Sequence, residues 1–223
     1  MAYLGLALFA EGPTDHRFLK PVLRRLCENM CLQHAKMMVD IGDVLELHSP
    51  VRVREESREI RIREAARESR GAWHILFIHA DGSGDYLGAR ESLVLPACRA
   101  IAGEMGDAHR QTVAVIPVRE TEAWCLVDGD ALRRSFGTTK GNTELDLPER
   151  GRDVEGILDP KSALNEVCRR AISSRRRRGR RRKAAEFLDQ IGEFVSIGQL
   201  DQVPAFGRLR QEVLDALVHL GYI

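Results

Sequence analysis

Acidic side chains stand directly after three apolar stretches of this 223-residue chain. Carboxylate oxygens are the ligands that hard cations such as Mg²⁺ and Mn²⁺ take, and these ions neutralise phosphate charge and make water nucleophilic. Acids delivered to one space from several segments would therefore predict a metal site that cleaves phosphoesters. The candidate metal ligands are Glu11, Asp81, Asp85, Glu120 and Glu122.

The acids at 81 and 85 follow the apolar run at residues 73–80. That run is short, contains β-branched and aromatic residues and is halted by glycine, which predicts a buried strand. Gly82 and Gly84 allow a sharp turn after it. Asp81 and Asp85 can therefore point into one space and share a divalent cation.

The elements that must position these acids alternate along the chain. Strand, helix, strand, helix, strand, helix, strand is typical of a parallel sheet with helices on both faces. Ligands of such sheets lie outside the carboxyl ends of the strands, so the acidic clusters are expected to meet at one edge. The predicted strands cover residues 3–10, 36–47, 73–80 and 112–118, and the predicted helices follow residue 15 and cover 53–70 and 88–105.

Two local details of these helices are also predicted. Thr14 or Asp15 can cap the first helix, because both side chains accept hydrogen bonds from backbone N–H groups. Glu59 and Arg63 are spaced as an i,i+4 ion pair on a solvent-exposed helix face.

The amino-acid composition of the chain changes after about residue 130. Residues 137–156 are rich in Gly, Thr, Asn, Asp and Pro and predict a surface loop, and a helix is expected from Asp159 to about residue 172. Two more helices should close the chain. We therefore expect an α/β core at 1–130 and a loop and helical extension at 131–223 that packs on it.

A net charge of +1 hides a strong asymmetry. Residues 169–183 hold ten of the 34 Lys and Arg and no acid, so the rest has 24 basic and 33 acidic residues, a charge of −9. Such a run repels itself unless phosphates neutralise it, which predicts contact with a DNA or RNA backbone. An acidic protein surface fits it too, including that of another copy, so a homo-oligomer stays open. The candidate nucleic-acid-binding residues are Arg175, Arg176, Arg177, Arg178, Arg180, Arg181, Arg182 and Lys183.

The five cysteines have no paired spacing, which suits a reducing compartment and predicts a cytoplasmic location. Cys27, Cys31 and His34 share a helix face without a fourth ligand, so buried thiols are favoured over zinc. No apolar run approaches the roughly 20 residues of a membrane helix, and the first residues are expected to form a strand rather than a signal peptide. The sequence contains no Gly-x-x-x-x-Gly-Lys loop, so we do not expect this chain itself to hydrolyse ATP.

Three blocks of the sequence resemble a known family. They read Glu-Gly-Pro-Thr-Asp at 11–15, His-Ala-Asp at 79–81 and Ile-Pro-Val-Arg-Glu-Thr-Glu-Ala-Trp at 116–124. Glu-Gly after the first strand and an Asp-x-x-x-Asp cluster after a later one look like the TOPRIM domain of topoisomerases, DnaG-type primases and overcoming-lysogenization-defect (OLD) nucleases. The three blocks in this order are similar to bacterial TOPRIM-like proteins often encoded beside ATPases in phage-defence loci.

The resemblance covers roughly residues 3–128, with an extension to Lys161 left open, and implies a Rossmann-like, TOPRIM-like sheet. It implies a nuclease dependent on Mg or Mn that acts on DNA or RNA with an ATPase partner. Glu11 would bind metal or act as general base, Asp81 would be the first metal-binding aspartate, and Lys161 would stabilise charge on the phosphate.

The sequence departs from the usual Asp-x-Asp of that family. Ser83 stands where the second aspartate is expected, and Asp85 is its candidate replacement, so the number of metal ions stays open. A non-catalytic nucleic-acid-binding or regulatory subunit of an ATPase is the alternative that Ser83 favours. A phosphohydrolase of small molecules is a third. His79 is expected either to bond an acid or to be a core histidine, and Trp124 to be a core residue.

Overall fold

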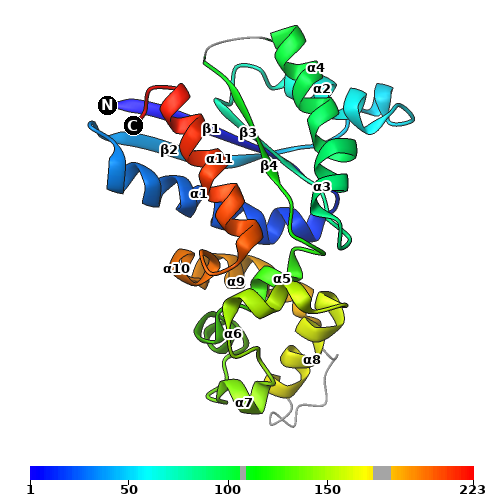
Figure 1. Ribbon diagram of the computed structural model, residues 1–223, viewed down its shortest axis with the longest axis vertical. Helices are drawn as coiled ribbons and strands as arrows, with labels where there is room; N and C mark the ends of the chain where they lie inside the picture. The colour runs from blue at the N-terminus through cyan, green and yellow to red at the C-terminus, as the bar shows by residue number, and fades with distance from the viewer. Residues whose placement is uncertain (106–108, 173–181) are drawn as a thin grey trace.

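A four-stranded sheet forms the centre of the computed structural model, which describes residues 1–105, 109–172 and 182–223 (Figure 1). The strands lie in the order β2-β1-β3-β4, and every pairing between them is parallel. The predicted α/β class, a mostly parallel sheet flanked by helices, is confirmed. The strands are β1 (Ala2–Phe9), β2 (Val39–Leu47), β3 (Ile75–His79) and β4 (Gln111–Val115).

Successive side chains of the central strands enter two separate apolar cores, because strand residues alternate between the faces of a sheet. Leu6 and Leu8 pack with the long helix α1 (Pro13–His34) on one face. Ala7 packs on the other face with α2 (Arg58–Glu68) and α4 (Leu95–Met105). β3 is buried along its whole length, as expected of a strand covered on both sides.

The start of α1 differs from the prediction. Gly12, not Thr14 or Asp15, is the N-cap residue, and Pro13 occupies the first helical position. Asp15 lies in the first turn, where its Oδ2 accepts a hydrogen bond of 3.0 Å from the Gly12 N–H. A carboxylate is therefore fixed within the first turn after β1, at the positive end of the helix.

A π-helical segment, Arg90–Val94, joins α3 (Tyr86–Ala89) to α4. A π turn is wider than an α turn, and such turns inside helices are rare. Arg90 pairs with Glu212 at 3.1 Å, and the Leu93 carbonyl accepts a hydrogen bond of 3.2 Å from Arg58 Nε. The segment thereby contacts elements on two sides of it.

The helices that follow β4 gather beyond the carboxyl end of the sheet, in the lower part of Figure 1. The predicted loop at 137–156 contains a helix and a 3-10 turn, and the helix expected at Asp159–172 is α8. The helices are α5 (Glu122–Cys125), α6 (Gly129–Phe136), α7 (Asn142–Leu145), α8 (Pro160–Ile172), α9 (Leu188–Phe194) and α10 (Ile197–Leu200). The 3-10 turns are Val51–Val53, Gly151–Gly156 and Ala184–Phe187.

The last helix, α11 (Pro204–His219), returns from this helical layer and packs against β4 and α1. Phe206, Leu209, Val213 and Leu217 form its buried stripe. Glu212 accepts a hydrogen bond of 2.9 Å from the Ala114 N–H, so a helix covers part of the edge strand β4. Among the described residues, no helix is both long enough and apolar enough to cross a bilayer.

Candidate metal site

Three side chains at the carboxyl end of the sheet offer ligand atoms that all lie within 4.8 Å of one another. They are Asp15, His79 and Asp81. His79 ends β3, Asp81 follows it by two residues, and Asp15 lies just beyond the neighbouring strand β1. The chain leaves β1 for β2 on one side and returns to β3 on the other, and a crevice at such a switch point is where open α/β sheets bind ligands.

Thr121 connects two members of this group. Its hydroxyl donates to Asp15 Oδ1 at 3.0 Å and lies 3.1 Å from His79 Nε2. Because a hydroxyl has a single proton and Asp15 receives it, His79 Nε2 must be the donor to the Thr121 oxygen. In a neutral imidazole with its proton on Nε2, the Nδ1 lone pair is free, and this is the form in which imidazole binds metals.

The His79 Nε2 atom lies 3.4 Å from Asp81 Oδ1. Several buried polar atoms at this edge nevertheless have no hydrogen-bond partner within the described part of the chain. They include His79 Nδ1, Asp81 Oδ1 and Glu120 Oε2. Each such atom costs about 1–3 kcal/mol, and folded proteins leave few of them. A divalent cation would satisfy imidazole and carboxylate lone pairs together, so the residues present fit a metal ion.

Glu11 is not part of the three-residue group, but an arginine of α2 links it to this edge of the sheet. The Arg58 Nη1 atom lies 3.3 Å from Glu11 Oε1, and Arg58 also donates to the His79 carbonyl. Burial lowers the pKa of Arg58, whereas the charges of Glu11 and Asp81 raise it. Arg58 is thus close to both acids, and Glu11 and Asp81 lie on the same side of the molecule.

Glu122 approaches from the third strand end as the first residue of α5 and is buried. Burial raises the pKa of its carboxyl group, and the charges of Asp15 and Glu120 raise it further. Lys161 opposes this shift, with its Nζ atom 4.0 Å from Glu122 Oε1. The Lys161 side chain is 61% exposed, so it can reach a bound phosphate.

Asp85 has another role in the structure. Its Oδ1 caps α3 by accepting a hydrogen bond of 2.9 Å from the Gly88 N–H, and it is not part of the three-residue group. Ser83 has φ of 49° and Gly84 has φ of 93°, which form the turn between Asp81 and Asp85. A Cβ atom on Gly82 would lie 2.5 Å from the Pro117 carbonyl oxygen, so only glycine lets the two loops approach.

Most of the basic run lies outside the described residues. Arg182 and Lys183 are described, and the Arg182 Nε atom donates to Glu186 at 3.1 Å while its guanidinium lies 4.0 Å from the centre of the Phe187 ring. The predicted nucleic-acid contacts that fall outside are Arg175, Arg176, Arg177, Arg178, Arg180 and Arg181.

Sequence reasoning assigned Asp15 to capping alone and gave no role to Thr121 or Arg58. Asp15 lies within the Glu-Gly-Pro-Thr-Asp block and Thr121 within the Arg-Glu-Thr-Glu block, so the sequence did contain a signal for these two residues. The predicted pair of Glu59 with Arg63 is wrong, because Arg63 pairs with two other acids. Those acids are Glu64, at 3.1 Å, and Glu104, at 3.2 Å.

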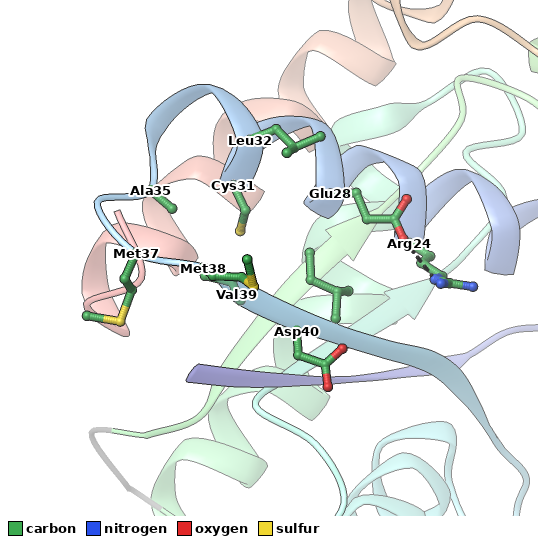
Figure 2. Close-up of a pocket in the computed structure, with 10 residues that line it drawn as sticks. Arg24, Glu28, Cys31, Leu32, Ala35, Met37, Met38, Val39 and Asp40 are labelled. Carbon is green, nitrogen blue, oxygen red and sulfur yellow. Dashed lines mark ion pairs between the residues drawn. The ribbon is translucent and has the colours of Figure 1, made fainter. Parts of the chain in front are cut away.

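A hollow of about 500 Å³ lies at the opposite end of the sheet, between the end of α1 and the start of β2 (Figure 2). Leu32, Met37 and Met38 are exposed around it, and its ion pair joins Arg24 to Glu28 at 3.0 Å. Cys31, which lines it, has a pKa raised by burial and therefore stays a thiol. Nothing in this hollow resembles the polar group at the carboxyl end.

Fold and site together define an α/β protein whose candidate metal site lies at the carboxyl end of a parallel sheet. Residues 10–213 match the family described as domain of unknown function (DUF4276), and because this match spans most of the chain, the protein belongs to that family. It contains every residue of the candidate site. Comparison with curated proteins and with solved structures gave no match.

Proposed function

We propose that this protein is a metal-dependent nuclease that cleaves phosphodiester bonds in DNA or RNA. The observation that carries the proposal is the convergence of Asp15, His79 and Asp81 at one edge, with Glu11 and Glu122 beside them. The resemblance of the three sequence blocks to TOPRIM nucleases supports it. On that resemblance alone, the proposal extends to an ATPase partner and to phage defence, and the unpaired cysteines extend it to a cytoplasmic location.

Asp15 and Asp81 would hold the ion through carboxylate oxygens, with His79 contributing its free Nδ1 or orienting the two acids. A bound Mg²⁺ or Mn²⁺ supplies charge neutralisation at the phosphate and a water activated near neutral pH. Mn²⁺ tolerates an imidazole ligand better than Mg²⁺ does, so Mn²⁺ is the better probe.

The side chains around this group have roles that follow from their surroundings. Glu11 is held by Arg58 at the edge of the site, where it can bind metal or accept a proton from water. Burial raises the pKa of Glu122, which favours a role for this carboxyl group as a proton donor to the leaving oxygen. Lys161, beside it, can stabilise charge on the phosphate.

The test is the substitution Asp81→Asn, assayed with labelled DNA and RNA in Mn²⁺. Cleavage should fall by at least about 100-fold, because the loss of a direct ligand costs at least as much as the loss of an outer-shell group. The melting temperature without metal should stay the same or rise, since crowded carboxylates repel each other. Asp40→Asn, at an exposed position of β2, is the matched control. Full cleavage by the Asp81→Asn protein would reject the proposal.

A non-catalytic subunit is the second candidate, and Asp85 favours it, because its carboxylate caps a helix and is not available as a replacement second aspartate. Calorimetric titration with Mn²⁺ separates the two functions. A nuclease should show a Mn²⁺ site that weakens on Glu11→Gln, whereas a subunit that binds no metal should show no such site in either protein.

A further inference from the structure

Beside Glu11, a hollow of about 410 Å³ opens where β1 and β2 end and α2 begins. This volume falls in the range of about 300–1,000 Å³ of small-ligand clefts, but the walls expose mainly polar atoms, which suits a charged group rather than an apolar ligand. The polar side chains in the wall are those of Glu11, His48, Ser49, Arg58 and Arg61.

Positive charge in this hollow exceeds what its one carboxylate balances. Arg58 and Arg61 share the wall, and the charge of Arg61 lowers the pKa of Arg58. Arg58 is paired with Glu11 at 3.3 Å. Arg61 makes no ion pair with any described residue, and its Nε atom is buried without a hydrogen-bond partner there. A buried guanidinium nitrogen without an acceptor costs free energy that a bound anion would recover.

The position of the two arginines on α2 also favours a bound anion in this hollow. Both lie in the first turns of the helix, whose N-cap is Ser57 with its hydroxyl accepting from the Ile60 N–H at 3.4 Å. Cations at a helix N-terminus are disfavoured by the helix dipole, while anions are favoured there. Arg58 is held there by Glu11 and by the carbonyls of His79 and Leu93, whereas a bound anion would offset the unfavourable position of Arg61.

We propose that this hollow binds a phosphate group of the polynucleotide, next to the phosphate that is cleaved, with Arg61 as its main contact. Arg58 would serve both this phosphate and Glu11, and His48 and Ser49, which follow the end of β2, would add donors. The planar guanidinium offers two parallel N–H donors that match phosphate oxygens. The polynucleotide part of this inference rests on the proposed function, whereas the anion site rests on the hollow itself.

The experiment measures binding of a labelled single-stranded oligonucleotide to the full chain in EDTA, which prevents cleavage. Arg61→Gln should weaken binding by about tenfold or more and lower the slope of log K against log salt by about 0.7. Arg61→Lys should bind with intermediate affinity, because lysine keeps the charge but not the fork. Arg99→Gln, which removes an arginine that is 71% exposed on α4, should bind like the wild type. Thermal unfolding verifies that each variant is folded.

Competition by inorganic phosphate separates the two sources of a phosphate group. We expect inorganic phosphate to displace the oligonucleotide only at far higher concentration. If it binds as tightly as the oligonucleotide and loses affinity on Arg61→Gln, the hollow takes free phosphate and the polynucleotide assignment is overturned. Unchanged oligonucleotide binding and salt slope in Arg61→Gln would overturn the anion site itself.

The outcome is independent of the metal site. Weakened binding in Arg61→Gln, together with a wild-type protein that cleaves nothing in Mn²⁺, would support the phosphate site and reject the nuclease. Cleavage that depends on Asp81, together with unchanged binding in Arg61→Gln, would support the nuclease and reject the phosphate site.

Discussion

The two ends of the parallel sheet differ in what they leave without a partner. At the carboxyl end, buried polar atoms of His79, Asp81 and Glu120 lack hydrogen bonds to described residues. At the amino end, apolar side chains are left in contact with solvent, with Leu32 87% and Met38 74% exposed. Imidazole and carboxylate atoms are ligands that a cation would satisfy, whereas exposed apolar side chains offer no ligand atom for an ion. Chemistry is therefore expected at the first end only.

The largest effect that would test this contrast is stabilisation by Mn²⁺. At a free concentration of about 100 times its Kd, a ligand adds about 2.7 kcal/mol, which raises the melting temperature of a chain of this size by roughly 5–11 °C. Asp15→Asn should abolish the rise, while its remaining amide oxygen can still accept from Thr121. Asp40→Asn should keep it. An equal rise in the Asp15→Asn protein would place the ion elsewhere.

A smaller effect concerns Glu122 in the metal-free protein. Its pKa is raised by burial and by Asp15 and Glu120, so its folded form holds a proton more tightly than the unfolded chain does. Its contribution is therefore most favourable at low pH and is lost as pH rises above the ordinary glutamate value through the folded one.

Glu122→Gln should consequently raise the melting temperature in EDTA at pH 7, and the gain should be smaller at pH 4, where the glutamate is more fully protonated in both states. Lys161 limits the gain, because it partly balances the carboxylate at 4.0 Å. Differential scanning calorimetry at the two pH values measures it. A loss of stability at pH 7 would mean that the ion pair with Lys161 outweighs burial.

The smallest effect is expected at the amino end. Leu32→Ser changes an exposed side chain of α1, and substitutions at such positions alter stability by about 0.5 kcal/mol or less. Mn²⁺ binding and cleavage should match the wild type. A loss of either would show that the two ends are coupled and would remove the basis of the comparison.

The sequence predicted the parallel sheet, because the alternation of strands and helices depends on local patterns, and it placed the candidate acids directly after the strands. Glu11, Asp81 and Glu122 each follow an apolar stretch that became a buried strand, and parallel strands bring their carboxyl ends together. Asp85 was predicted to be a metal ligand, but its carboxylate caps a helix by accepting a hydrogen bond from the Gly88 N–H three residues later.

The remaining site residues depend on tertiary contacts that no spacing reveals. Thr121 and Asp15 are 106 positions apart yet share a hydrogen bond. Arg58 lies on a charge-rich helix that reads as solvent-exposed, but its guanidinium turns inward over the ends of β1 and β3. The helices beyond the sheet were also not fully predicted from the sequence, because the short helix α7 lies in a stretch whose composition predicts only a loop.

The geometry of the site depends on the number of residues in the π-helical segment Arg90–Val94. A π turn accommodates one residue more than an α turn, so a one-residue deletion there would restore a regular ladder and rotate α3 relative to α4. The Leu93 carbonyl would then turn away from Arg58 Nε, and the guanidinium beside Glu11 would lose one of its anchors. Among relatives, the length of this turn should therefore vary together with the residue at position 58, even though the two are 35 residues apart along the chain.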